Sequence, residues 1–237
     1  NFEIINNIKS LKVQDIIKEG AIKAGELFDI EEVEKLIEKS TNSLADKGYA
    51  FASIIPEYQL DDLERKVYIK FVIEESARYY VRRINITGNY RTSDKVIRRE
   101  ILLAENDPFN LAKLRNSERN LRALDFFKNV TLDTAPRSQD QLDLEVQVEE
   151  KSTGYFSLAG GYSTTEGALL RFGITENNLL GLGHQLNLSL SKAAKNINTS
   201  VSYTNPYFLD YDFSFGFDYV YTDHQKRRYR QYDHKIH

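Results

Sequence analysis

The sequence contains no cysteine, no apolar run long enough for a membrane-spanning helix and no excess of positive charge. Without cysteine the chain has no disulfide, no cysteine-ligated zinc and no cysteine nucleophile. A spanning helix needs about 18 or more consecutive apolar residues, and the chain has no such window. Lys and Arg total 32 against 35 Asp and Glu, and the net charge of -3 argues against binding of duplex nucleic acid.

Motifs of common catalytic and nucleotide-binding sites are also missing, including Gly-x-Ser-x-Gly, the phosphate-binding loop and the dinucleotide fingerprint. His234 and His237 form a lone His-x-x-His pair, which without a third ligand nearby is a poor metal site. We therefore expect neither an enzyme nor a bound metal or cofactor. The chain begins Asn1-Phe-Glu-Ile without Met or a leader peptide, so we expect a part of a longer protein.

Two segments repeat one pattern, which is clearer in the second copy. There, alternation from Tyr80 to Ile86 predicts a strand that stops at Gly88-Asn89. Thr92 or Ser93 is expected to cap a helix that reaches Leu103. A second helix is expected from Asn110, with Leu111, Leu114, Leu121 and Leu124 on one stripe. Strands near 128–134 and 141–149 complete the order β-α-α-β-β.

The first copy runs from Ala24-Gly-Glu-Leu-Phe28 to a strand over 67–75. Asp29 and Glu32 form a capping box at its second helix, and its first strand is expected within Phe2 to Ile8. The pattern predicts two α+β modules, over residues 1–78 and 79–151.

After Lys151 the helical period gives way to alternation with a period of two, which predicts successive β-strands. One parity is apolar and is assigned to lipid, namely Phe156, Leu158, Leu170, Phe172, Ile174, Leu186, Leu188, Leu190, Phe213, Phe215 and Phe217. The other parity is assigned to a barrel lumen, for example Ser157, Arg171, Asn187, Ser189, Ser214 and Asp218.

A soluble β-sandwich produces the same alternation, so the strands alone leave two architectures open. Small polar residues on one parity and aromatics near strand ends favour a transmembrane β-barrel. A strand of about 10 residues, tilted by about 45°, crosses roughly 23 Å, which fits the apolar band of such barrels. We expect five strands, and six if Tyr229 to Ile236 forms one. The segment 152–237 therefore predicts an incomplete barrel, because such barrels start at about eight strands.

Several motifs, in this order and spacing, resemble the BamA family of outer-membrane protein assembly factors. The residues that carry the resemblance are Tyr80 to Asn89, Arg98 to Ile101, Asn120 to Val130, Val148 to Phe156, Asn177 to Gly183 and Thr204 to Phe208. The resemblance implies that the repeats are the last two periplasmic POTRA modules and that residues 152–237 are the first barrel strands. It also implies a location in the outer membrane.

In that family the intact protein folds and inserts other barrel proteins, so unfolded outer-membrane proteins and lipid are expected partners. The resemblance makes the first barrel strand a template edge, with Gly154, Phe156, Leu158, Gly160, Gly161 and Tyr162. Gly160 and Gly161 either weaken strand pairing or only permit curvature. The resemblance also assigns Arg98 and Glu105 to an accessory lipoprotein similar to BamD, although both are alternatively ordinary solvated charges.

In POTRA modules a short strand accepts an extended peptide by β-augmentation, here 51–57 and 129–135. Both are alternatively plain edge strands protected by Pro56 and Pro136. Two rival functions stay open. One is a POTRA-barrel transporter that secretes a polypeptide through its own pore, and the other is a soluble periplasmic adaptor.

Overall fold

The computed structural model describes residues 2–8, 11, 27–61, 63–74, 76–164, 167–194, 196–226 and 229–236. It forms two compact units. One contains Asn1–Asn85, Ile101–Asn120 and Thr131–Val146, and the other contains Ile86–Glu100, Leu121–Val130 and Gln147–His237. The boundary between the units therefore passes through the second repeat.

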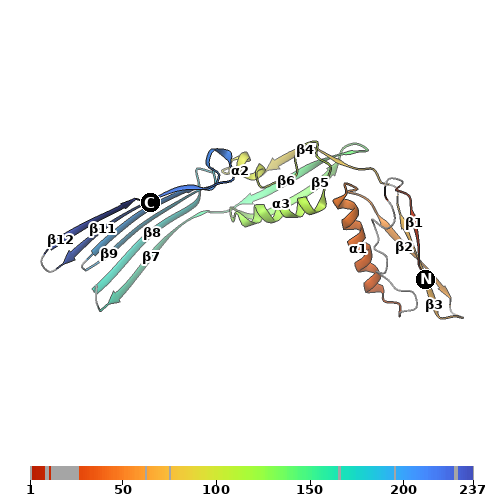
Figure 1. Ribbon diagram of the computed structural model, residues 1–237, viewed down its shortest axis with the longest axis horizontal. Helices are drawn as coiled ribbons and strands as arrows, with labels where there is room; N and C mark the ends of the chain where they lie inside the picture. Colours follow the sequence, from red (N-terminus) through yellow and green to blue (C-terminus); the bar gives the residue numbers. More distant parts are fainter. Residues whose placement is uncertain are drawn as a thin grey trace. The chain divides into compact units, whose positions relative to one another are not determined.

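The first repeat is built on a three-stranded sheet in the order β1 (Phe2–Asn6), β3 (Lys66–Ile73) and β2 (Ile54–Asp61). Strand β1 runs parallel to β3, and β2 runs antiparallel to it (Figure 1). Helix α1 (Ile30–Asp46) begins after Asp29, whose carboxylate accepts a hydrogen bond from the Glu31 N–H at 2.8 Å. Asp29 therefore caps the helix, but its partner is the Glu31 N–H and not the Glu32 N–H that the expected capping box requires. The first helix expected in this repeat falls outside the described residues.

The core of the first repeat consists of buried apolar side chains. Leu44 of α1 and Phe71 and Ile73 of β3 are fully buried. They pack with the other buried members of the cluster, which are Ile8, Val33, Tyr49, Ala52, Ile54 and Ile69. Burial of each large apolar side chain contributes about 1.5–3 kcal/mol, so this cluster is the main source of the repeat's stability.

The second repeat has the same architecture. Its sheet has the order β4 (Tyr80–Thr87), β6 (Gln141–Glu150) and β5 (Phe127–Pro136). Helices α2 (Asp94–Arg98) and α3 (Leu111–Ala123) lie between β4 and β5 in the chain. The predicted order β-α-α-β-β is confirmed. No helix among the described residues has the length and hydropathy needed to cross a membrane.

A buried carboxylate lies on β6 between two arginines. Arg82 donates two hydrogen bonds to Asp143, at 2.7 and 2.6 Å, and Arg137 donates a third at 2.8 Å. The Arg82 hydrogen bond is the largest influence on the carboxyl group and, with Arg137, lowers the pKa of Asp143 to about 2, although burial alone would raise it. Asp143 is therefore a satisfied structural charge.

The helix expected to reach Leu103 ends at Arg98, so that prediction was wrong. Ile101 and Leu103 are both buried, at 9% and 3% exposure, whereas Leu102 between them is 45% exposed. Residues two apart lie about 200° apart around an α-helix, so a helix cannot bury both. The chain is not helical there, and the Leu102 N–H donates to Ser117 Oγ at 2.8 Å. Ser93 makes no side-chain cap hydrogen bond.

Residues after Lys151 form one six-stranded antiparallel sheet in which neighbours in the chain are neighbours in space (Figure 1). The strands are β7 (Gly154–Ser163), β8 (Gly167–Leu179), β9 (His184–Ala193), β10 (Asn196–Asn205), β11 (Phe215–Lys226) and β12 (Tyr229–Ile236). The sixth strand is therefore present. The sheet ends at β7 on one side and at β12 on the other.

Strands β8 and β11 have boundaries that alternation alone does not predict. Strand β8 continues to Leu179, with a register irregularity after Glu176, so Asn177 and Asn178 belong to this strand. Strand β11 begins at Phe215, not Phe213, because the backbone of Phe213 is bonded to Tyr211 and Phe208 in a turn around η2 (Phe208–Asp210). The charged segment after Thr222 continues β11 to Lys226, since backbone pairing with β12 does not depend on side-chain charge.

Candidate functional site

Strand β7 is the edge of the six-stranded sheet nearest the second repeat in the chain. Among the described strands it pairs only with β8, from Gly154 opposite Glu176 to Ser163 opposite Gly167. The N–H and C=O groups on its other side have no strand partner in the described part of the chain. An edge of this kind is able to pair with a further strand.

The two central glycines of β7 are not required by their surroundings. A Cβ on Gly161 would meet nothing within 4 Å, and a Cβ on Gly160 would lie 3.9 Å from the Leu169 carbonyl oxygen, an ordinary contact. Neither has a positive φ. Glycine at these positions still weakens a strand, because it has no side chain to pack and more freedom to lose.

The start of β7 is different. A Cβ on Gly154 would lie 2.6 Å from a carboxylate oxygen of Glu176 on β8. The strand is therefore close-packed where it leaves the second repeat and open further along.

The strand register places the apolar residues on one face of the sheet. Leu158 lies opposite Phe172, Phe172 opposite Leu190, and Ile174 opposite Leu188. Cross-strand partners point to the same face. The same register joins the remaining apolar positions to this face, namely Phe156, Leu170, Leu186, Val201, Tyr203, Phe215, Phe217 and Tyr219. This set is called the apolar face below, and several of its members are strongly exposed.

The opposite face is polar. Ser157, Arg171, Asn187, Ser189 and Asp218 all occur at the alternate parity, as the sequence predicts. Ser189 and Ser200 are hydrogen bonded across β9 and β10 at 2.7 Å. Phe213 and Ser214 precede β11, so the register assigns neither of them to a face.

The residues expected to contact a partner protein have intramolecular contacts. Arg98 Nε donates to Asp94 at 2.5 Å, and both side chains are exposed. Glu105 accepts a hydrogen bond from the Ile84 N–H on strand β4 at 3.2 Å. Arg98 is thus part of a helical surface, whereas Glu105 also satisfies a backbone donor of the sheet.

Strands β2 and β5 are edge strands of their sheets. Strand β5 contains the whole expected segment 129–135, whereas β2 begins at Ile54 and contains only part of 51–57. Pro56 lies inside β2 opposite Phe71, and Pro136 is the last residue of β5. A proline in an edge strand removes one N–H from pairing.

Sequence reasoning missed a polar network where the second repeat meets the strands. Asn178 donates to the Thr92 hydroxyl at 2.9 Å and accepts from the Gly183 N–H at 2.8 Å, and both bonds are buried. Glu150 accepts from the N–H groups of Arg91 and Thr92, at 2.9 and 2.6 Å. Burial alone would raise the pKa of Glu150, but the Thr92 hydroxyl and these N–H donors together lower it.

The network continues to the first residue before β7. Glu176 accepts hydrogen bonds from the Thr153 hydroxyl and from the Asn178 N–H. The Asn177 N–H donates to the Thr153 carbonyl at 3.2 Å. Glu150, Thr92, Asn178, Glu176 and Thr153 form a continuous set that is called the junction network below.

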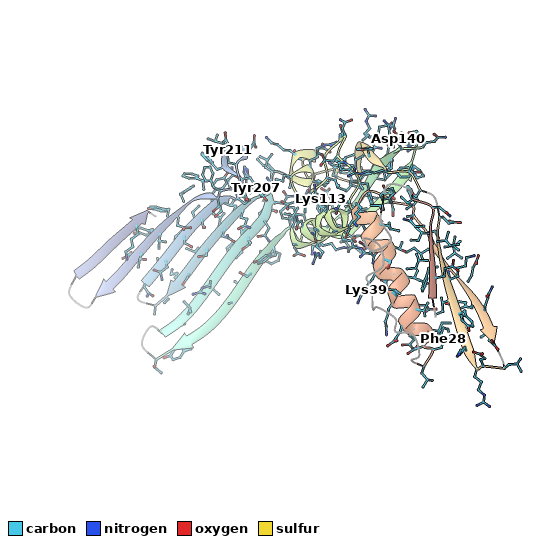
Figure 2. All side chains as sticks on the ribbon, turned by 45° about the vertical axis from the view of Figure 1, so that its right-hand side comes forward. Phe28, Lys39, Lys113, Asp140, Tyr207 and Tyr211 are labelled. Atoms are coloured by element: carbon cyan, nitrogen blue, oxygen red, sulfur yellow. The ribbon has the colours of Figure 1, made fainter. Side chains whose placement is uncertain are left out.

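Arg99 makes a second contact between the repeat and the strands. Its guanidinium lies 4.0 Å from the centre of the Tyr207 ring, within cation–π range. The Tyr207 hydroxyl donates to Glu100 at 3.2 Å, and burial and the Glu100 charge raise the pKa of Tyr207. Tyr207 and Tyr211 lie at the η2 end of the sheet (Figure 2). Gly183 leaves room for this arginine, since a Cβ there would lie 2.6 Å from Arg99 Nη2.

One signal in the sequence could have indicated the junction network. Glu176 and Asn178 are polar residues at positions of β8 where the alternation calls for apolar ones, just before the Leu180–Gly183 turn. A solvent-exposed turn alone does not explain a carboxylate at such a position. Their partner Thr92 is far away in the chain, so the pairing itself was not readable.

Comparison with known proteins agrees with this architecture. A family model described as POTRA, surface antigen variable number repeat, matches residues 2–76 and again 79–151. A family model described as Omp85 superfamily domain matches residues 178–236. The two POTRA matches together cover more than half of the chain.

The outer membrane protein assembly factor BamA of Neorickettsia risticii is 31% identical over 94% of this chain and 30% of the relative. BamA of Neisseria meningitidis is 32% identical over 83% of this chain and 25% of the relative. The crystal structure of Haemophilus ducreyi BamA lacking POTRA domains 1–3 superposes with a TM-score of 0.86 at 26% identity, over 99% of this chain and 46% of that one.

The chain thus spans less than a third of the length of these two curated relatives. The two repeats and the antiparallel sheet occur in the same order as the two family matches, although the second match begins at residue 178 and the sheet at Gly154. The chain belongs to the POTRA family, with repeats at residues 2–76 and 79–151, and its residues 178–236 match the Omp85 superfamily domain.

Proposed function

We propose that the protein of which this chain is a part folds and inserts β-barrel proteins into the outer membrane, without catalysing a chemical reaction. The observation that carries the proposal is strand β7, an edge strand next to an extended apolar face. The curated relatives are outer-membrane assembly factors, which supports the same role. The POTRA repeats, residues 1–78 and 79–151, lie in the periplasm, and the strands of 152–237 lie in the membrane.

Physical chemistry favours a template for this task. A backbone N–H or C=O left unpaired in hydrocarbon costs several kcal/mol, so an incoming strand needs immediate pairing. An edge strand supplies a row of donors and acceptors with the correct spacing. Gly160 and Gly161 weaken the packing of β7, which makes exchange of its partners easier.

The apolar face meets lipid in this proposal. Exposed side chains such as Phe156, Leu158 and Leu170 are costly in water and favourable in hydrocarbon. The polar face, with Arg171 and Asp218, meets a hydrated lumen. Besides Phe156, Leu158 and Leu170, the residues that face lipid are Phe172, Ile174, Leu186, Leu188, Leu190, Phe215 and Phe217. Phe213, at the end of the sheet, also faces lipid.

The repeats serve binding. We assign Arg98, with the exposed surface of α2 around it, to an accessory lipoprotein of the BamD type, and Glu105 to the same partner. The edge strands β2 and β5 are suited to hold extended segments of unfolded outer-membrane proteins by β-augmentation. Pro56 and Pro136 then limit how far such pairing extends.

Site-directed crosslinking in the full-length protein tests the role of β7. Leu158→Cys places a thiol on the edge strand, and Leu188→Cys places one on the same face of the interior strand β9. A client barrel protein with a cysteine in its last strand should form disulfides with Leu158→Cys and not with Leu188→Cys. Equal crosslinking of both variants would contradict templating by β7. Export of the client through the protein, without insertion, would favour a transporter.

A further inference from the structure

The two ends of β7 differ in how firmly the rest of the molecule holds them. At the start, Thr153 is 8% exposed, and its hydroxyl and carbonyl are bonded to Glu176 and to the Asn177 N–H. At the far end, Tyr162 is 81% exposed, and a Cβ added to Gly161 would have no neighbour within 4 Å. The first end is therefore fixed by buried polar bonds and the second is held mainly by the ladder with β8.

The junction network explains why the start is fixed. Glu150 ends β6 and Gly154 begins β7, so only the three residues from Lys151 to Thr153 join the two sheets covalently. The junction network also connects Glu150 with Thr153 through Thr92 and Asn178, which are 3% and 5% exposed. Buried polar groups without a partner are costly, so each member makes the others harder to release. Asn178 is central, since its amide uses both its oxygen and its nitrogen.

We infer that the junction network pins the start of β7 to β8 and to the second repeat, so that the edge strand changes partners from its Tyr162 end. The inference deepens the proposed function, on which its role in assembly rests. Release of the pairing of β7 then begins at the Tyr162 end, which is held by its ladder with β8, and proceeds toward Gly154. The pinned start keeps the register, because a slip by one residue would turn every side chain to the wrong face.

Hydrogen exchange of the full-length protein in lipid nanodiscs tests the pin. In the parent, amides of residues 152–158 should exchange at least about tenfold more slowly than amides of 159–164. Asn178→Ala leaves the Thr92 hydroxyl and the Gly183 N–H without this partner and should accelerate exchange in 152–158 by about tenfold or more. Asn177→Ala, at the next position and with a side chain outside the network, is the matched control and should leave exchange unchanged.

Thr153→Val is a second, milder variant. It keeps the size of the side chain and removes only the hydroxyl that donates to Glu176. It should also accelerate exchange in 152–158, while exchange in β9 and β10 stays at the parent rate. If Asn178→Ala and Thr153→Val both match Asn177→Ala, or if residues 159–164 are the better protected end in the parent, the inference is wrong.

A parallel assembly assay separates this inference from the proposed function. Asn178→Ala should slow insertion of a client barrel protein relative to Asn177→Ala. Faster exchange in residues 152–158 together with normal insertion would support the attachment of the start of β7 by the junction network and would refute the templating role of β7. Unchanged exchange would refute the pin, whatever the rate of insertion.

Discussion

Replacement of Leu188 by arginine tests the assignment of the apolar face to lipid. Leu188 is near the middle of β9, and its cross-strand partners are Ile174 on β8 and Val201 on β10. All three point to the apolar face. Asn187, the preceding residue, points to the polar face between Thr175 and Ser202. Positions 187 and 188 therefore lie on opposite faces of the sheet but at nearly the same depth in the membrane.

The expected magnitude follows from that depth. A ten-residue strand tilted by about 45° spans roughly 23 Å of membrane, so Leu188 lies about 10 Å or more from either surface. Arginine on the lipid face near the midplane costs about 2–4 kcal/mol, which is roughly a 30- to 1,000-fold change in the folded-to-unfolded ratio. Asn187→Arg should cost far less, because its guanidinium stays hydrated and faces Asp218 two strands away.

Reversible urea unfolding of the full-length protein in lipid bilayers measures both costs. Labelling gives an independent check, since a lipid-confined thiol reagent should modify Leu188→Cys faster than Asn187→Cys. The assignment fails if the two arginine variants lose equal stability, or if Asn187→Cys is labelled faster. Either result would also restore the soluble sandwich as an alternative.

Three further predictions concern the repeats and their junction with the strands. The depressed pKa of Asp143 stabilises the second repeat above about pH 4, and this contribution is lost as the pH falls toward 2. The Asp143→Asn variant should therefore be less stable than the parent at pH 7 and should approach the stability of the parent near pH 2. An acid titration followed by circular dichroism measures both. Gly181→Ala should cost roughly 2 kcal/mol or more, because φ is +75° and the new Cβ would lie 1.9 Å from a backbone carbonyl oxygen, whereas Gly161→Ala should be nearly neutral in the same unfolding assay. Arg99→Lys should lose about 1 kcal/mol of coupling to the tyrosine ring it stacks on, and a double-mutant cycle with removal of that ring would show no coupling if the contact is unimportant.

Periodicity predicted the parts of the fold in which one residue type repeats along one face. Alternation over Phe156 to Leu190 placed these residues on a single side, and the register agrees strand by strand. The β-α-α-β-β order was also readable, because helix stripes and strand alternation have different periods. These patterns are local in the chain, so no knowledge of distant contacts was needed.

Element ends were less readable where a distant residue decides them. Helix α2 stops at Arg98 because Ser117, on α3, takes the Leu102 N–H. Strand β11 starts late because Phe208 and Tyr211 bind the backbone of Phe213 first. In both cases one or two hydrogen bonds decide the boundary, and such bonds leave no periodic trace in the sequence.

The junction network was missed for the same reason. Thr92 or Ser93 was predicted to cap a helix; Ser93 stands at the cap position without a side-chain bond, and the Thr92 hydroxyl accepts a hydrogen bond from Asn178 on β8. Residues that favour caps and turns are also the residues that join separate elements, and local sequence does not distinguish the two uses. The template edge itself was predicted only through a family resemblance, since an edge strand and an interior strand alternate alike.

The pairing of β1 with β3 has a consequence for the order of folding. Phe2 lies opposite Ile69 and Asn6 opposite Ile73, so almost the whole first repeat separates the two paired strands in the chain. Each strand from β7 to β11, in contrast, pairs with the next strand along the chain. Closing a long loop carries a greater entropic cost than closing a hairpin, and non-local pairing is slow. During synthesis from the N-terminus, the strand with which β1 pairs in the described structure, β3, emerges only after about sixty further residues, so this pairing forms late.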